Sequence, residues 1–344
     1  MSNKEDKQGL LLSDAQLSAE LNRCEYCEEK PCREACPVDC SPADFIMAAR
    51  KMAPQDILRS AAKIMASNPL GGICGSVCPD KHCMAECSRK LFDKPINIPD
   101  VQAEIVYRAK ELGGIPDFNK PEANGKKIAV IGAGPAGLGA AAVLAQKGYK
   151  IDIFEARGEE GGMCNLIPQH RLNRDVLKTD IEFLKSLGDI TVNTGSPVED
   201  PKELLEKDYK SVIVTAGLWK PITMGIPGEE LAVNAVDYLT DPLKYDFKGK
   251  IAVIGGGASA LDCAVIAKKN GAENVEMFSL ESFAEMPLTE RERNELLEYG
   301  IEISGRSRVT AIKGDNGSIG GIDTVKINLN GEQFNLEDLE DIEG

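Results

Sequence analysis

Histidine and positive charge are scarce in this sequence. His82 and His170 are its only histidines, which leaves little material for a multi-histidine zinc site or for more than one Ser-His-Asp triad. Lys and Arg number 40 against 55 Asp and Glu, and the net charge of −15 repels nucleic-acid phosphates and anionic lipid. Most hydrolase chemistry and a nucleic-acid role are therefore disfavoured.

The sequence also lacks a long apolar run. The N-terminus, MSNKEDKQGLLLSD, has three consecutive leucines, too few for the core of a secretory signal. The uncharged stretch over residues 128–146 is interrupted by glycines and a proline, so a strand, a tight turn and a helix explain it better than a membrane span. We expect a cytoplasmic protein without membrane insertion.

Cysteine, in contrast, is concentrated near the N-terminus, where nine of the 11 cysteines lie in the first hundred residues. In a reducing cytosol such crowding indicates metal ligands or redox groups rather than structural disulfides. The two groups read Cys24-x2-Cys27-x4-Cys32-x3-Cys36-Pro37 and Cys74-x3-Cys78-Pro79-x3-Cys83-x3-Cys87. Eight thiolates and two Cys-Pro pairs predict two 4Fe-4S clusters, and a pair of zinc sites is the alternative.

The three remaining cysteines carry no such pattern. Cys164 and Cys263 have no partner at Cys-x2-Cys or Cys-x4-Cys spacing, which disfavours a disulfide-reductase mechanism. We expect Cys164, Cys263 and Cys40 to be small buried or loop thiols.

The length of 344 residues predicts two or three domains at about 150 residues each. Residues 1–112 are predicted to be helical, with prolines 42 and 54 opening helices between the cysteine groups. Residues 113–124 are rich in Gly, Pro and polar residues and predict a linker. Beyond it, GKKIAVIGAGPAGLGAAAVLAQKGY from Gly125 is echoed by GKIAVIGGGASALDCAVIAKKNGA from Gly249, which predicts two copies of one nucleotide-binding unit.

The first copy fits the dinucleotide fingerprint. Gly132-x-Gly134-x-x-Gly137 follows an expected strand and opens an expected helix, so pyrophosphate can approach the backbone amides there. Glu155 ends the second expected strand, 150–154, where a carboxylate can accept hydrogen bonds from ribose hydroxyls. An FAD-binding domain is predicted over residues 125–245.

The second copy predicts an NAD(P)H-binding domain over residues 246–344. Its turn runs Gly255, Gly256, Gly257, Ala258, Ser259, with Ala260 in place of the third glycine. Glu281 follows the expected strand 274–278. A carboxylate there favours NADH over NADPH because it bonds a free 2′-hydroxyl and repels a 2′-phosphate; the alternative is a solvated loop charge. Residues 309–334 predict antiparallel strands, and the last ten residues form an acidic tail.

The chain resembles the glutamate synthase small-subunit family, and within it the electron-input half of dihydropyrimidine dehydrogenases. The resemblance rests on both cysteine groups, Pro95-Ile96-Asn97-Ile98 with Gln102, Gly161-Gly162-Met163, Ile167-Pro168-Gln169-His170-Arg171-Leu172 and GGGASALDCA. It implies an α/β protein in which an all-α iron-sulfur domain precedes two Rossmann-like domains, with the NAD(P)H domain inserted in the FAD domain. Electrons would pass from nicotinamide to FAD to the clusters.

The same resemblance implies site residues. Cys24, Cys27, Cys32 and Cys87 would hold one cluster, and Cys36, Cys78, Cys83 and Gln102 the other, with Cys74 left as a non-ligand. Gly162, Arg171 and Gly217 would join the FAD site. Family members that use NADPH tend to have arginines where this chain has Leu280 and Glu281, which supports NADH.

One departure concerns the C-terminal segment with which the family closes its FAD domain. The present sequence stops before it, so we expect a fragment or an FAD site completed by a partner. No substrate-reducing residues are identified. The expected role is an electron-transfer flavoprotein subunit whose partner completes the reaction. Pyrimidine reduction is the leading candidate, glutamate synthesis or flavin-based bifurcation with transhydrogenation the alternatives, and a non-catalytic redox-sensing or scaffold module the opposing class.

Overall fold

The computed structural model describes residues 12–115, 118, 121–315 and 318–342. Its contacts divide the described chain into two compact units. The first extends to Asn165 and continues over Gln169–Gly217, and the second comprises Leu166–Pro168 and the residues from Leu218 onward. The predicted linker falls partly outside the described residues, at positions 116, 117, 119 and 120, as do residues 1–11 and the last two of the acidic tail.

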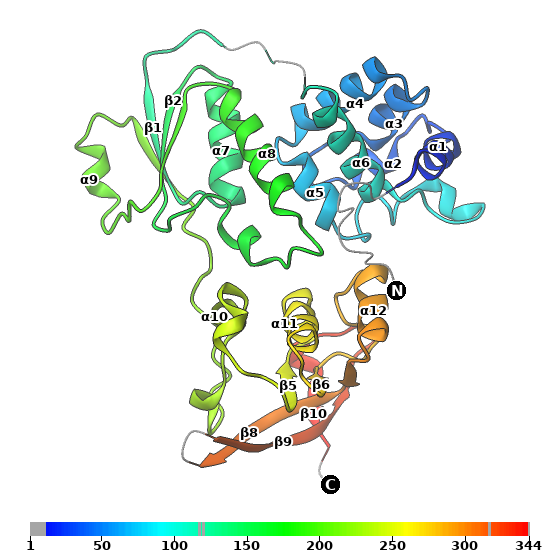
Figure 1. Ribbon diagram of the computed structural model, residues 1–344, viewed down its shortest axis with the longest axis vertical. Helices are drawn as coiled ribbons and strands as arrows, with labels where there is room; N and C mark the ends of the chain where they lie inside the picture. The colour runs from blue at the N-terminus through cyan, green and yellow to red at the C-terminus, as the bar shows by residue number, and fades with distance from the viewer. Residues whose placement is uncertain (1–11, 116–117, 119–120, 316–317, 343–344) are drawn as a thin grey trace. The chain divides into compact units, whose positions relative to one another are not determined.

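The first unit begins with helices, drawn in blue to cyan in Figure 1, and the described chain up to residue 115 contains no strand. The predicted helices that open at prolines are confirmed as α3 (Pro42–Ala49) and α4 (Pro54–Ser67). The other helical elements are α1 (Asp14–Arg23), α2 (Pro31–Glu34), α5 (Gly71–Val77), η1 (Ser88–Leu91) and α6 (Ile98–Glu111). Leu17, Phe45, Ile64 and Ile105 are fully buried between them, so this part has its own apolar core.

A parallel sheet in the order β3-β2-β1-β4 completes the first unit. Its strands are β1 (Lys127–Ile131), β2 (Lys150–Phe154), β3 (Ile190–Asn193) and β4 (Ser211–Val214). Helices α7 (Pro135–Ala145) and α8 (Arg174–Ser186) pack together beside it, while Leu204 of α9 (Lys202–Leu205) packs on Phe154 and Ile131. Since β1 lies between β2 and β4, the turn that follows it is covered by neighbouring chain.

The second unit carries two small sheets (Figure 1). The parallel sheet has the order β5-β6-β7. The predicted antiparallel strands are confirmed as β8 and β9, and β10, which lies in the predicted acidic tail, pairs with β9 to give the sheet β10-β9-β8. The strands are β5 (Lys250–Ile254), β6 (Asn274–Phe278), β7 (Glu302–Ser304), β8 (Ser307–Asp315), β9 (Ser318–Leu329) and β10 (Leu339–Asp341). The helices are η3 (Glu229–Leu231), α10 (Ala235–Thr240), η4 (Pro242–Lys244), α11 (Ala258–Lys269), α12 (Glu290–Glu298) and η5 (Leu336–Asp338).

The compact units divide the chain at Leu218, whereas the sequence predicts a domain boundary between residues 245 and 246. Residues 218–245 group with the second unit because α10 packs on α11 and Pro227 accepts a hydrogen bond from the Ile312 amide of β8. The assignment of these units to FAD and NAD(P)H, and the insertion of one domain in the other, stay predictions. The mixed α/β fold with a helical N-terminal part is confirmed.

Within the described ranges, no helix combines the length and the apolar character needed to cross a bilayer.

Candidate redox-cofactor sites

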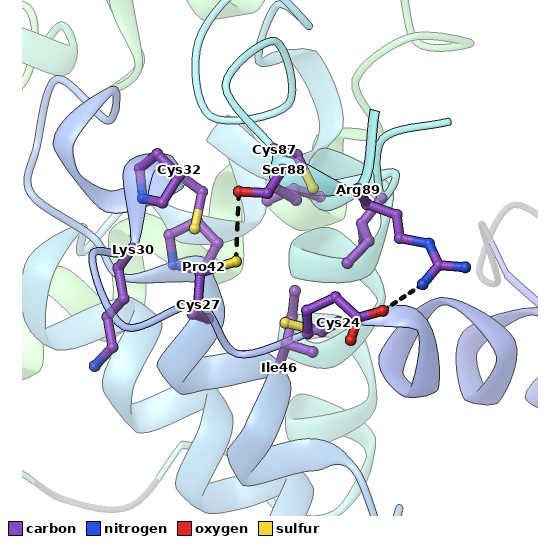
Figure 2. Close-up of a pocket in the computed structure, with 14 residues that line it drawn as sticks. Cys24, Cys27, Lys30, Cys32, Pro42, Ile46, Cys87, Ser88 and Arg89 are labelled. Atoms are coloured by element: carbon purple, nitrogen blue, oxygen red, sulfur yellow. Dashed lines mark hydrogen bonds and ion pairs between the residues drawn. The ribbon is translucent and has the colours of Figure 1, made fainter. Parts of the chain in front are cut away.

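Four cysteines from separate parts of the helical region line one pocket. Cys24 lies directly after α1, Cys27 follows in the next loop, Cys32 is in α2, and Cys87 precedes η1. Figure 2 shows their sulfur atoms arranged around the pocket. The structure thus brings together the four cysteines that the resemblance implies for one cluster.

The rest of the pocket wall is largely apolar, formed by residues that include Pro42, Ala43, Ile46, Ile96 and Ile98. Ser88 lies 3.4 Å from the Cys27 sulfur (Figure 2). Arg89 pairs with Glu25 and, at 2.9 Å, with Asp93. These contacts fix the loop after Cys87 against the loop after Cys24, which keeps cysteines far apart in the sequence on one pocket.

The donor set fits an iron-sulfur cluster. Burial raises the pKa of Cys24 and Cys32, and neighbouring cysteines raise it further. Iron coordination supplies the positive charge that buried thiolates need. Among the residues that the structure describes, no three Cys, His, Asp or Glu side chains converge on a single metal-ion position. A 4Fe-4S cluster takes Cys thiolates as its four ligands, and four cysteines line this one pocket.

The second set of cysteines lies around α5. Burial raises the pKa of Cys83 to about 12 and that of Cys78 to about 11, and the nearby Cys36 contributes to both shifts. Cys74 also adds to the shift of Cys78, while the Gln102 Nε2 donates to the Gly71 carbonyl at 2.8 Å. Cys74 is therefore part of α5, and Gln102 of α6 contacts α5. The assignment of Gln102 rather than Cys74 as the fourth ligand stays a prediction.

The cysteines expected to be core thiols are buried. Burial raises the pKa of Cys40 and Cys263 to about 12 and that of Cys164 to about 11. Such thiols are poor nucleophiles at neutral pH because the thiolate is disfavoured.

The first glycine turn leaves no room for a side chain at two positions. Gly132 has φ +102°, and a Cβ there would lie 2.4 Å from the Thr215 carbonyl oxygen. A Cβ on Gly137 would lie 2.0 Å from the Gly132 oxygen and 2.7 Å from the Thr215 hydroxyl. Gly134 is the N-cap of α7, whose first-turn amides are available to a phosphate. The turn therefore fits a dinucleotide pyrophosphate.

Glu155 is buried beside this turn. Its carboxylate accepts from the Ala133 amide at 2.7 Å and the Arg157 amide at 2.9 Å. A carboxylate has about four acceptor positions, so it can still bind ribose hydroxyls.

The other residues predicted for the flavin site come from three later segments. Gly162 approaches the turn, since a Cβ on it would lie 2.8 Å from the Gly134 Cα. Arg171 is half-buried before α8, and Gly217 follows the Thr215–Ala216 pair that packs on Gly132.

The second glycine turn is more open. Gly255 has φ +137°, Gly257 caps α11, and Ala258, Ser259 and Ala260 form the first turn of that helix. Gly256 is close to Glu281, because a Cβ there would lie 2.7 Å from the Glu281 Oε2. The Ser279 hydroxyl donates to the same oxygen at 2.5 Å. Glu281 is therefore held over the turn, where a nucleotide ribose would lie.

Sequence reasoning missed the contact between the helical region and the first nucleotide-binding unit. Asp180 of α8 is fully buried, bonds the Lys110 Nζ at 2.6 Å and accepts from the Ile73 amide of α5 at 2.8 Å. A Cβ on Gly72 would lie 2.8 Å from the same carboxylate. The only local signal is an acid at a position where α8 is otherwise apolar, at Leu177, Ile181 and Leu184.

Two family profiles match the chain. Pyridine nucleotide-disulphide oxidoreductase covers residues 126–337, and dihydropyrimidine dehydrogenase domain II, 4Fe-4S cluster, covers residues 2–113. Together they support an oxidoreductase with flavin, NAD(P)H and iron-sulfur cofactors.

Curated relatives agree with these profiles. The chain is 31% identical to the NAD-dependent dihydropyrimidine dehydrogenase subunit PreT of Escherichia coli K12, over 86% of this chain and 73% of that one. It is 30% identical to the glutamate synthase [NADPH] small chain of Halomonas elongata, over 91% and 69%. It is 33% identical to the NADP(+)-dependent formate dehydrogenase subunit beta of Moorella thermoacetica, over 87% of this chain and 46% of that protein.

Among solved structures, the amine oxidase HisD of Pseudomonas geniculata matches with a TM-score of 0.51 and 22% identity, over 82% of this chain and 40% of that one. This likeness concerns the fold alone. The relatives confirm the resemblance to the glutamate synthase small-subunit family, and the chain belongs to the pyridine nucleotide-disulphide oxidoreductase family, with a 4Fe-4S region of the dihydropyrimidine dehydrogenase type ahead of the nucleotide-binding units.

Proposed function

We propose that the chain is an electron-transfer flavoprotein subunit that takes electrons from NADH and delivers them to a partner subunit. The observation that carries this proposal is the gathering of Cys24, Cys27, Cys32 and Cys87 on one pocket, in the same compact unit as the first glycine turn. When bound, FAD accepts a hydride from NADH and releases single electrons to the clusters.

In this proposal the residues of the chain bind and orient the cofactors. Gly132, Gly134 and Gly137 let the FAD pyrophosphate approach the start of α7, and Glu155 accepts from its ribose. The packing of α8 on α5, fastened by Asp180, holds the flavin-binding unit against the cluster helices. Bound FAD and the first cluster would therefore be held by one compact unit.

The number of clusters and their ligands belong to the proposal. One cluster would use Cys24, Cys27, Cys32 and Cys87. The other would use Cys36, Cys78, Cys83 and Gln102. Cys36→Ala and Cys87→Ala should each remove a different cluster, while Cys74→Ala should leave the iron content near wild type. Iron analysis and electron paramagnetic resonance of the three variants test this, and loss of a whole cluster in Cys74→Ala would show that Cys74 is a ligand.

The preference for NADH is supported by the place of Glu281. Its carboxylate lies over the second turn, where it would bond a free 2′-hydroxyl and repel a 2′-phosphate. Stopped-flow reduction of the flavin by NADH and NADPH at equal concentration measures the preference, and faster reduction by NADPH would contradict it.

The final electron acceptor would be bound by the partner. Curated relatives are named as subunits of a dihydropyrimidine dehydrogenase, a glutamate synthase and a formate dehydrogenase, so pyrimidine reduction is one of several outlets. The chain loaded with FAD and clusters should reduce ferricyanide with NADH but leave uracil, thymine and 2-oxoglutarate with glutamine unchanged. Product from the homogeneous chain alone would reveal a substrate site that we have missed. Failure to reduce the dye would instead favour a non-catalytic module.

A further inference from the structure

An arginine lies beside the acid that the proposed function assigns to the ribose. Arg306 connects β7 to β8, and its backbone amide donates to the Glu281 carbonyl at 3.2 Å. Its Nη1 donates to the Leu280 carbonyl at 3.2 Å. Both its main chain and its guanidinium are therefore tied to the loop that carries Glu281.

That position matters because nucleotide-binding folds distinguish the two nicotinamide nucleotides at this point. An acid after the second strand selects a free ribose, whereas a nearby arginine accommodates a 2′-phosphate. This chain has both side chains at the same loop. Either the arginine contributes to phosphate binding, or another group prevents it from doing so.

Glu285 is placed to prevent Arg306 from binding a 2′-phosphate. Its carboxylate lies 2.7 Å from the Arg306 Nη2 and also accepts from the Ser282 amide at 2.9 Å. Hydrogen bonds from Ser282 are the main cause that lowers the pKa of Glu285, with Arg306 contributing, so the carboxylate is ionised at neutral pH. The Phe334 ring lies 5.8 Å from the guanidinium carbon on another side. The side chains of Arg306 and Glu285 remain 24% and 29% exposed, so a ligand can reach them.

We propose that Glu285 is a specificity-determining residue that keeps the guanidinium of Arg306 paired and unavailable to a 2′-phosphate. Glu281 then meets the ribose beside an arginine whose charge is already paired. This inference rests on the proposed nucleotide binding at the second turn and adds a second acid to it. Removing the Glu285 charge should free the Arg306 guanidinium to donate a charge-assisted hydrogen bond to a 2′-phosphate.

Binding of adenosine fragments tests this without turnover. On the full chain loaded with FAD and clusters, isothermal calorimetry would compare 5′-AMP with 2′,5′-ADP. Glu285→Gln should raise the affinity for 2′,5′-ADP by about tenfold, the effect of one added charge-assisted hydrogen bond, and leave that for 5′-AMP within about twofold. Glu298→Gln, which removes the same charge from an exposed site on α12, should leave both affinities unchanged.

Arg306→Ala provides the complementary test and depends less on how Glu285→Gln folds. In the otherwise native chain it should change neither affinity by more than about twofold, because the paired arginine contributes nothing to phosphate binding. In the double variant with Glu285→Gln, the gain for 2′,5′-ADP should disappear.

Two results would overturn the inference: an unchanged preference in Glu285→Gln, or a loss of 2′,5′-ADP affinity in Arg306→Ala alone. Absence of 5′-AMP binding in the native chain would instead contradict the proposed nucleotide site itself.

Discussion

The two glycine turns of this chain share a sequence pattern but differ in their surroundings. In the first, β1 lies between two strands, and Thr215 and Ala216 after β4 pack directly on the turn. In the second, β5 is the edge of its sheet within the described residues, and a Cβ on Gly255, the counterpart of Gly132, would meet the Ala260 methyl at 3.3 Å and no neighbouring strand. The demand for glycine therefore comes from the neighbouring strand as much as from the nucleotide.

This difference explains the alanine in the second turn. At Gly137 an added methyl would lie against a carbonyl and a hydroxyl. At Ala260 the methyl is present in the first turn of α11. A turn without a covering strand can carry alanine at the third position and still open a helix.

The two acids that follow β2 and β6 also differ in how firmly the surrounding chain holds them. Glu155 is buried and bonded to two backbone amides, whereas Glu281 is held chiefly by the Ser279 hydroxyl. The first acid is part of the fold of its turn, whereas the proposed function assigns the second to the choice between ligands. Substitutions at the first site should therefore affect stability, and those at the second should affect preference.

The largest effect is expected where α8 packs on the cluster helices within the first unit. Asp180→Ala removes a fully buried carboxylate, so the Ile73 amide loses its acceptor and Lys110 keeps only the Thr179 hydroxyl of its two partners on α8. The free energy of unfolding should fall by about 4 kcal/mol, as for other broken buried pairs. Urea denaturation measures it. Asp175→Ala, at an exposed site on the same helix, should cost less than about 1 kcal/mol, and equal losses in both variants would contradict the role of burial.

Gly137→Ala should have the next largest effect, because its methyl clashes with backbone that β4 holds in place. We expect a loss of about 3 kcal/mol and reduced FAD content. The matched change in the second turn, Ala260→Gly, removes a methyl without a clash and should cost only about 1 kcal/mol of helix propensity. If both changes proved equally mild, the covering strand would not be the cause of the glycine requirement.

Glu155→Gln should have the third largest effect on stability. The amide retains one oxygen acceptor but presents an N–H₂ group to one of the two backbone amides, which costs about 2 kcal/mol. Thermal unfolding of the cofactor-free chain measures this loss of stability separately from FAD binding. An unchanged melting temperature would mean that the buried carboxylate is not needed to shape the turn.

Glu281→Gln should have the smallest effect on stability, less than about 0.5 kcal/mol, because its side chain has one main partner at a loop. Its effect should appear instead in the ratio of the rates of flavin reduction by NADH and NADPH, which should fall toward one as the repulsion of the 2′-phosphate is removed. A preserved ratio would identify Glu281 as a solvated loop charge.

Local patterns in the sequence account for much of this molecule. Strand 150–154 and strand 274–278 are predicted to the residue, as are the proline-opened starts of α3 and α4, because their signals lie within a few positions. Helix α5 lies in the region predicted to be helical, but its bounds were not predicted. Its glycines are required by close packing: Gly71 lies against Ile64 and Met65, Gly72 against Asp180 and Gly75 against Ala103.

Contacts between distant segments could not be predicted in this way. Asp180 and Lys110 are 70 positions apart, and Glu285 and Arg306 are 21 apart across a helix and a strand. Neither spacing corresponds to a helix or strand period, because such pairs depend on which segments pack together. The shared pocket of the first cysteine set was expected only from the family resemblance.

The central claim is that electrons pass from NADH through the flavin to the clusters within this chain. Anaerobic addition of NADH to the chain loaded with FAD and clusters, followed by rapid freezing and electron paramagnetic resonance, tests it most directly. We expect the flavin absorbance to fall first and signals of reduced 4Fe-4S clusters to appear afterwards. A reduced flavin beside clusters that remain oxidised, although dithionite reduces them, would contradict the claim.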